Sequence, residues 1–240
     1  MPPNESRVAE ARAALAAVTD PELDQSVVEL GFIADVGVAG SCVAVAFRLP
    51  TFWCSAGFAW IMAEDMRAAL LGLAWVEEAD VRLVDHFAAG RINAGVAAGR
   101  GFRSAFGDEA AGDLAALRET FRRKAFLGRM AALIEALRAD GMSDAAIVSL
   151  TLGDLAKAPV AAVFVARYRE LRVVYGGPAG EGDAAFRKPD GAAIPAGTLG
   201  AWLRDVRMTR RSAEANGEMC RVLLKGRYDG LVRGERSPAG

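Results

Sequence analysis

Two short apolar runs with a tight turn between them constrain the fold of this chain more than any other feature. The turn centres on Gly40, and the run after it alternates Val43, Val45 and Phe47 with smaller residues, as a strand with one buried face does. The predicted order is helix, strand, strand, helix and strand, over residues 6–18, 32–38, 42–48, 58–73 and 76–84. This order predicts an α+β domain with helices packed on one small sheet.

The rest of the chain has a different pattern, which predicts a mainly α-helical C-terminal region. A long amphipathic helix is expected at 112–139 and is ended by Gly141 as a left-handed cap. Another helix is expected at 199–224, with an interruption near Asn216 and Gly217. The predicted domains are an α+β domain at 1–87, a glycine-rich connector at 88–110, a mainly helical region at 111–230 and a disordered tail at 231–240.

Charge balance and cysteine content exclude several classes of protein. With 29 basic and 30 acidic residues the formal net charge is -1, whereas a general nucleic-acid binder needs a marked basic excess. No segment approaches the ~18 consecutive apolar residues of a membrane helix, and the N-terminus lacks the pattern of a signal peptide. Three scattered cysteines fit a reducing compartment rather than a secreted disulfide framework. We therefore expect a cytoplasmic protein with no nucleic-acid or membrane partner.

Cys54 is the first candidate for chemistry. It follows a predicted strand and precedes an amphipathic helix, where backbone N–H groups and the helix dipole favour the thiolate. A thiolate binds a soft metal or attacks an electrophile. The alternative is a buried cysteine that serves as a small apolar side chain. No CxxC motif or neighbouring Cys/His pair accompanies Cys54, so its spacing leaves both roles open.

His86, the only histidine, follows the last predicted strand and stands beside Asp85. An imidazole with a neighbouring carboxylate is a candidate metal ligand or acid–base group. Adjacent strand residues point to opposite faces, however, so a polar residue at a strand end is the alternative. A cysteine-dependent enzyme is a weaker hypothesis, because His86 is the one evident base for it.

Cys220 lies on the C-terminal helix, after the basic run at 207–211. Guanidinium groups nearby are expected to lower the pKa of its thiol, whereas its apolar neighbours favour a packing role. The sequence does not determine whether Cys220 approaches Cys54, which would turn an isolated thiol into a pair. Cys42, on the second predicted strand, is expected to be structural.

Several carboxylates surround the turn at Pro21. Asp20 and Glu29 are candidate ligands or hydrogen-bond acceptors, although ordinary turn chemistry also explains an Asp before Pro21. The chain has no P-loop, Rossmann fingerprint, HExxH or GxSxG motif, so the common sites built on those motifs are excluded.

Three linked motifs resemble a known domain. They are VTDPEL at 18–23, SVVELGFI at 26–33 and LPTFWC at 49–54. Their order and spacing are similar to the iron–sulfur cluster assembly domain shared by PaaD-like and SufT-like proteins, over residues 7–86. The resemblance implies that Cys54 is the signature thiol of the family, in a site lined by Asp20, Glu29 and Thr51.

This sequence departs from the family's pattern at two positions. The family has proline after the signature cysteine, where this chain has Ser55, and its last strand leads into proline and tryptophan, where this chain has Asp85-His86-Phe87. These departures make His86 a candidate metal partner for Cys54, with Cys220 as a further candidate.

The resemblance implies a role in metalloenzyme maturation. Longer family members with a helical extension stand beside bacterial multicomponent di-iron monooxygenases, so the expected cargo is iron or a transient iron–sulfur cluster, and the expected partner is a client metalloenzyme or oxygenase subunit. One thiolate and a few carboxylates do not enclose a cluster in one chain, so a transient site or one shared in a homodimer is expected. The alternative is a metal-independent chaperone or adaptor that docks on an oxygenase subunit. An assembly or carrier factor is favoured over an enzyme.

Overall fold

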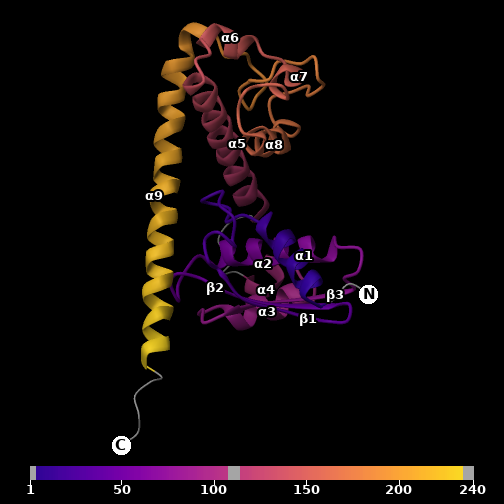
Figure 1. The fold of residues 1–240 in the computed structure, drawn as a ribbon. Coiled ribbons are helices and arrows are strands. Elements are labelled where there is room, and N and C mark those ends of the chain that lie inside the picture. The colour runs from indigo at the N-terminus through magenta and orange to yellow at the C-terminus, as the bar shows by residue number, and fades with distance from the viewer. Residues whose placement is uncertain (1–3, 108–113, 235–240) are drawn as a thin grey trace, which may run out of the picture. The chain divides into compact units, whose positions relative to one another are not determined.

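The computed structural model describes residues 4–107 and 114–234, and the chain divides into two compact units. The first unit consists of residues 1–118 and 214–240, and the second of residues 119–213. Both boundaries fall inside helices, α5 (Leu114–Ala139) and α9 (Ala196–Gly234). The expected α+β class is confirmed, with one small sheet in the first unit and helices elsewhere (Figure 1).

The sheet of the first unit has three strands in the order β1-β2-β3. Strands β1 (Ile33–Ala39) and β2 (Cys42–Arg48) pair antiparallel through the turn at Gly40, whose φ of 61° suits glycine. Strand β3 (Glu78–Val84) pairs parallel to β2, which requires the crossover helix α2 (Ala56–Leu71) between them. The predicted order of elements is thus confirmed.

One face of the sheet forms the core of the first unit. On β2 the predicted alternation is confirmed, because Val43, Val45 and Phe47 are buried and Ala44 is exposed. Helix α1 (Asn4–Ala16) and helix α2 pack with these strands, and Trp60 of α2 is fully buried. Burial of these side chains provides the main stabilisation of the unit.

The glycine-rich segment expected as a connector contains two helices, α3 (Ala89–Ala97) and α4 (Phe102–Phe106). Gly95 explains why this segment is helical and not an irregular connector: the absence of a side chain there permits close packing and does not mark a turn. A Cβ atom at Gly95 would stand 2.3 Å from Cη2 of Trp60. The Trp60 ring also packs edge-to-face on Phe102 and Phe106, with centroids 5.5 and 6.1 Å away.

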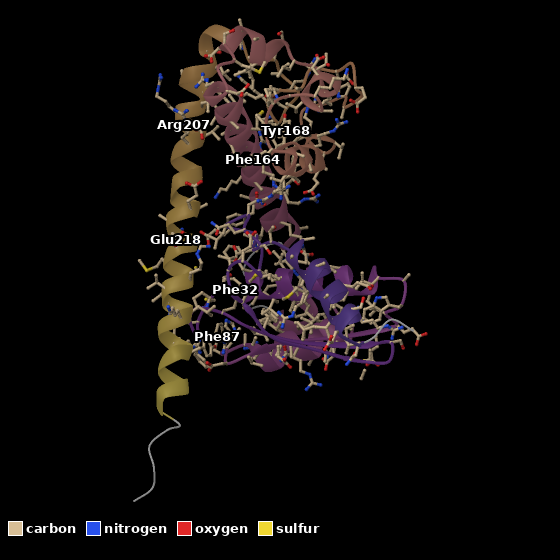
Figure 2. All side chains as sticks on the ribbon, in the orientation of Figure 1. Phe32, Phe87, Phe164, Tyr168, Arg207 and Glu218 are labelled. Atoms are coloured by element: carbon tan, nitrogen blue, oxygen red, sulfur yellow. The ribbon has the colours of Figure 1, made fainter. Side chains whose placement is uncertain are left out.

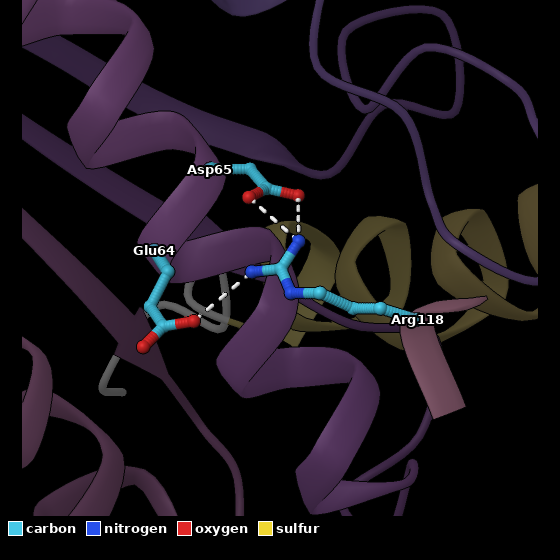
Figure 3. A network of polar contacts seen from close by, with 3 residues as sticks. All are labelled: Glu64, Asp65 and Arg118. Atoms are coloured by element: carbon cyan, nitrogen blue, oxygen red, sulfur yellow. Dashed lines mark hydrogen bonds and ion pairs between the residues drawn. The ribbon is translucent and has the colours of Figure 1, made fainter. Parts of the chain in front are cut away.

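Arg118, at the start of α5, ties that helix to α2. Its Nη1 donates to both carboxylate oxygens of Asp65 at 2.8 Å, and its Nη2 donates to Glu64 at 3.0 Å (Figure 3). A planar guanidinium that serves two adjacent carboxylates anchors the first turn of α5 on α2 within the first unit.

The second unit has its own core, built on Phe126, Tyr168 and Leu203. Besides parts of α5 and α9 it contains α6 (Asp144–Ser149), α7 (Leu152–Leu155) and α8 (Ala162–Arg172). Gly141, with a φ of 92°, ends α5 as predicted. Figure 2 labels Tyr168 and Phe164 on α8, the first buried and the second exposed.

Arg172 is completely buried in the second unit. Its guanidinium donates to five backbone carbonyls between 2.8 and 3.2 Å, so the charge is solvated by peptide dipoles rather than by a carboxylate. These carbonyls belong to Tyr175, Gly177, Pro178, Ala184 and Ala185. The side chain therefore organises the irregular segment that follows α8.

The interruption expected near Asn216 and Gly217 is wrong, because α9 continues through both residues to Gly234. Gly217 is buried within the first unit, where a Cβ atom would stand 2.5 Å from Nε2 of Gln25. The glycine allows the helix backbone to approach closely, as Gly95 does on α3. Of the tail expected at 231–240, residues 235–240 lie outside the described part of the chain.

Candidate functional site

Cys54 lies at the end of the loop that joins β2 to α2. The backbone N-cap of α2 is Ser55, so Cys54 directly precedes the helix, as the sequence predicted. Its side chain is half-buried, and Sγ lies 3.1 Å from the hydroxyl oxygen of Thr51. Thr51 and Cys54 are thus held together, and the hydroxyl is able to donate a hydrogen bond to a thiolate.

His86 supports the loop through the backbone of Cys54 rather than through its thiol. The amide of Ala88 donates to Nδ1 at 3.2 Å, which leaves the ring proton on Nε2, and Nε2 donates to the carbonyl oxygen of Cys54 at 2.8 Å. Burial, and then the charge of Arg227, lower the pKa of His86 below its ordinary value. Both ring nitrogens are occupied by backbone groups, so in this arrangement His86 positions Cys54 and offers no nitrogen to a metal.

Of the two candidate carboxylates, only Asp20 is buried. Its Oδ1 accepts hydrogen bonds from the amides of Glu22 and Leu23, both at 2.9 Å, in the turn that the sequence predicted. Burial raises the pKa of Asp20 to about 6, against the effect of these two bonds. Glu29 is exposed and has no hydrogen bond or ion pair within the described residues.

The last turns of α9 belong to the first unit and lie against the Cys54 loop. Arg227 donates to the carbonyl oxygens of Leu49 and Asp85, at 3.1 and 2.8 Å, and forms an ion pair with the Asp85 carboxylate. The hydroxyl of Tyr228 donates to the same carboxylate at 3.0 Å. In Figure 2 the loop that carries Phe87 lies beside the stretch of α9 that follows Glu218. Helix α9 is therefore hydrogen-bonded to both the loop after β2, which carries Cys54, and the loop after β3, which carries His86.

Cys220 lies on the same part of α9, half-buried against the core that Cys54 also contacts. Burial raises the pKa of its thiol to about 11, and the negative charges of Asp20, Cys54 and Glu22 act in the same direction. The expected lowering of this pKa by neighbouring guanidinium groups is wrong, because the effect of Arg221 is the smallest of these influences. Cys42, by contrast, begins β2 at the hairpin, at the end of the strand remote from Cys54.

The sequence analysis did not identify the residues of α9 that pack this helix on the rest of the first unit. Gly217, Arg221, Leu224 and Tyr228 recur at helical spacing and share a face, but the helix was expected to break at the first of them and to end at the third. Arg221 donates to the Gln25 side chain at 2.8 Å, and Leu224 packs next to Gly31. Continuing the same period past 224 would have revealed this face.

Three exposed aromatic side chains stand on the two loops that Cys54 and His86 belong to. Phe52, Trp53 and Phe87 are 45%, 76% and 54% exposed. The amide of Phe87 donates to the carbonyl of Phe52 at 3.0 Å, which joins the two loops. Exposed aromatic groups that stand close together are typical of surfaces that contact other proteins.

The arrangement leaves the metal ligand set incomplete. Within residues 4–107 and 114–234 no three His, Cys, Asp or Glu side chains gather closely enough to enclose a metal ion. All three cysteines are in this part of the chain, and none of them forms a disulfide. The described helices also include none that is long and apolar enough to cross a membrane.

Comparison with known families defines the class of this domain. Residues 9–81 match the model of the family described as iron-sulfur cluster assembly protein. The chain therefore carries a domain of the iron–sulfur cluster assembly family, and Cys54 and Thr51 lie inside it. In a search of curated proteins, no individual protein matches this chain. The role that the family indicates is thus iron–sulfur cluster assembly, and the helical extension is a feature of this chain beyond the matched domain.

Proposed function

We propose that this chain is a cytoplasmic maturation factor rather than an enzyme: it takes up iron, alone or in an iron–sulfur cluster, at Cys54 and delivers it to a client metalloenzyme. The family match at residues 9–81 supports assembly as the general role. The proposed client is an oxygenase component of a bacterial multicomponent di-iron monooxygenase.

The observation that carries this proposal is the position of Cys54. Its thiol is half-buried within the matched domain, 3.1 Å from the Thr51 hydroxyl oxygen, and the exposed side chains of Phe52 and Trp53 directly precede it in the loop. A thiolate ligand must lose its proton when it binds a metal, and a hydroxyl donor stabilises the charge that results. Because the protein supplies only a small number of ligands, the iron keeps coordination positions open for groups of the acceptor. Such a site suits a cargo that is passed on to another protein.

The other candidate residues have supporting roles in this proposal. Asp20 holds the turn at Pro21, and His86 holds the Cys54 backbone. Glu29 is exposed and contributes negative charge at the surface. A second copy of the chain is a further source of ligands, and the mass of the iron-loaded form tests for such a homodimer.

Delivery of iron to the client is the direct test. The chain is loaded with iron anaerobically and mixed with the iron-free oxygenase component in the presence of an external chelator, and oxygenase activity is then measured. We expect wild type and Cys42→Ser to restore activity and Cys54→Ser to restore none. Equal restoration by Cys54→Ser would contradict delivery through this thiol.

A metal-independent adaptor is the second candidate, and an apolar surface of the second unit favours it. Val163 and Phe164 at the start of α8, and Val173 and Val174 just after it, are between 43% and 68% exposed. Exposed apolar groups at both ends of this short helix favour a protein contact. An adaptor keeps its effect in Cys54→Ser and loses it in Phe164→Asp, which is the reverse of the pattern expected for a carrier.

A cysteine-dependent enzyme has less support from the geometry. Its base would have to be His86, but the Nε2 proton of that ring is donated to the Cys54 carbonyl oxygen and Nδ1 accepts from Ala88. A ring held in this way does not take a proton from the thiol.

A further inference from the structure

Residues 214–228 of α9 belong to the first unit, and one face of this stretch is packed there. Leu224 is buried beside Gly31, and the hydroxyl of Tyr228 donates to the Asp85 carboxylate at 3.0 Å. Figure 1 shows this last part of α9 running alongside the domain that contains the sheet. A helix that is already held in this way loses little conformational entropy when its outer face binds another protein.

The outer face of this stretch carries exposed apolar side chains. Met219, Val222 and Leu223 are 58%, 65% and 44% exposed, and the Cβ position of Gly226 has nothing within 4 Å. These four residues, which we call the outer stripe, follow the spacing i, i+3, i+4 and i+7, so they share one face of the helix. Single exposed apolar side chains are ordinary, whereas three large ones that adjoin on one helix face are typical of a contact surface.

Two opposite charges flank the outer stripe along the same edge. Glu218, labelled in Figure 2, and Lys225 are both exposed and lie seven residues apart, so they are two turns apart on one side of the helix. Glu218 accepts a hydrogen bond from Arg221 through Oε1 only, and Lys225 has no ion-pair partner among the residues that the structure describes. Within one helix Glu218 and Lys225 are about 10.5 Å apart along the axis, too far to neutralise each other.

This pattern is self-complementary for two antiparallel helices. A twofold axis midway between positions 221 and 222 places Glu218 of each copy opposite Lys225 of the other. The centre of the outer stripe is one residue further on, about 1.5 Å along the helix, so the same axis brings the two stripes together. In a parallel pair each edge would face the opposite edge of the second copy, where Asn216 and Arg227 supply no carboxylate. The charges therefore favour the antiparallel arrangement.

We propose that the outer stripe is a homodimer interface, in which two copies of this chain pair antiparallel along α9. Three large apolar side chains from each copy fill the seam, and a Glu218–Lys225 pair closes each end of it. The dimer requires neither metal nor Cys54, and the outer stripe lies outside the matched domain at residues 9–81. Because the seam is much shorter than a standard interface of about 800 Å² per partner, we expect the dimer to be reversible.

Sedimentation equilibrium of the metal-free full chain, with a chelator and a thiol reductant present, tests this interface. We expect the mass to rise from that of one chain toward that of two as the concentration increases. Val222→Asp places a carboxylate at the centre of the seam and should weaken the dimer at least about tenfold. Val163→Asp is the matched control, because Val163 is similarly exposed, 59% against 65%, but lies on α8. It should dimerise as wild type does.

Two results of this experiment would overturn the interface. One is a wild-type mass that stays that of one chain up to millimolar concentration, which would leave the outer stripe to a different protein. The other is an equal dissociation constant for Val222→Asp and wild type, which would move the dimer contact elsewhere. Circular dichroism checks that each variant keeps the helix content of wild type.

Exchange of the flanking charges tests the antiparallel register. Glu218→Lys and Lys225→Glu each place like charges at both ends of the seam, so each should weaken its own dimer by about fivefold. An equal mixture of these two variants restores both pairs of opposite charge and should dimerise as wild type does, as should the double variant. Positions two turns apart do not pair within one helix, so this rescue has to come from the second copy. Absence of rescue would overturn the antiparallel pairing.

Cys54→Ser separates this inference from the proposed function. The metal-free Cys54→Ser chain should dimerise as wild type does, and loss of its dimer would assign the contact to a shared thiol and overturn the outer stripe as the interface. A chain that stays monomeric but delivers iron would contradict the dimer alone. Iron delivery by Cys54→Ser would contradict the proposed function and leave the dimer unaffected.

Discussion

Nε2 of His86 lies 2.8 Å from the carbonyl oxygen of Cys54 and donates a hydrogen bond to it. The bond joins the loop after β3 to the loop after β2. The amide of Ala88 donates to Nδ1 of the same ring, so the ring proton lies on Nε2, the nitrogen that donates to Cys54. The single histidine of the chain therefore holds the backbone of Cys54 in place. Its contribution is positional, and it is open to direct test.

Removal of this bond should loosen the Cys54 loop. His86→Ala leaves the Cys54 carbonyl without its donor and should lower the free energy of unfolding by about 1 kcal/mol. His86→Gln, whose amide is able to donate to the same oxygen, should recover part of the loss. Urea denaturation measures both, and equal stability of His86→Ala and wild type would show that the bond does not support the loop.

The pH dependence of stability should contain two opposing contributions near pH 6. The lowered pKa of His86 means that the unfolded chain takes up a proton first, so its contribution to stability is lost as pH falls below the ordinary value of 6.5. The raised pKa of Asp20, about 6, acts in the opposite sense: its contribution is present below the ordinary value of 3.8 and is lost as pH rises through about 6.

Single variants separate these two contributions. Asp20→Asn should leave a stability that rises with pH between 5 and 7, roughly the range in which the histidine titrates. His86→Gln should leave one that falls as pH rises toward 6. Denaturation midpoints measured across this range would contradict the assignment if the two variants had slopes of the same sign.

Gly95 should tolerate no side chain. A Cβ atom there would overlap the rigid, fully buried ring of Trp60, so Gly95→Ala should destabilise the chain by about 1–3 kcal/mol. Gly90 is on the same helix with nothing within 4 Å of its Cβ position, and Gly90→Ala should be neutral or slightly stabilising. Thermal unfolding of the pair provides the comparison, and equal melting temperatures would contradict close packing at Gly95.

The buried guanidinium of Arg172 should be irreplaceable by lysine. An ammonium group cannot reach the five carbonyls that the planar guanidinium serves, so Arg172→Lys should cost at least about 2 kcal/mol. The exposed Arg204→Lys should change stability by less than about 0.5 kcal/mol. Hydrogen exchange of residues 175–187 should accelerate in the first variant only, and protection equal to wild type there would show that Arg172 does not order this segment.

Local periodicity was sufficient to predict the α+β domain. The alternation on β2, the turn at Gly40 and the amphipathic pattern of α2 are local signals, and they placed Cys54 immediately before a helix. The motif resemblance then identified the family that the match at residues 9–81 shows.

Long-range packing accounts for what the sequence did not reveal. Gly95 and Gly217 have the composition signal of a turn, yet each allows a close approach to a residue far away, Trp60 or Gln25. The bond from His86 to a carbonyl and the seat of Cys220 likewise depend on partners that no local pattern specifies. Sequence named these two residues as candidates but could not assign what they contact.

Whether Cys54 holds the iron cargo is measured as the iron retained per chain after anaerobic reconstitution with iron and sulfide and removal of unbound ions. Cys54→Ser and Cys42→Ser are compared with wild type in the same preparation, with folding checked by circular dichroism. We expect Cys42→Ser to retain as much iron as wild type and Cys54→Ser to retain almost none. Equal iron in Cys54→Ser and wild type would contradict this role of Cys54.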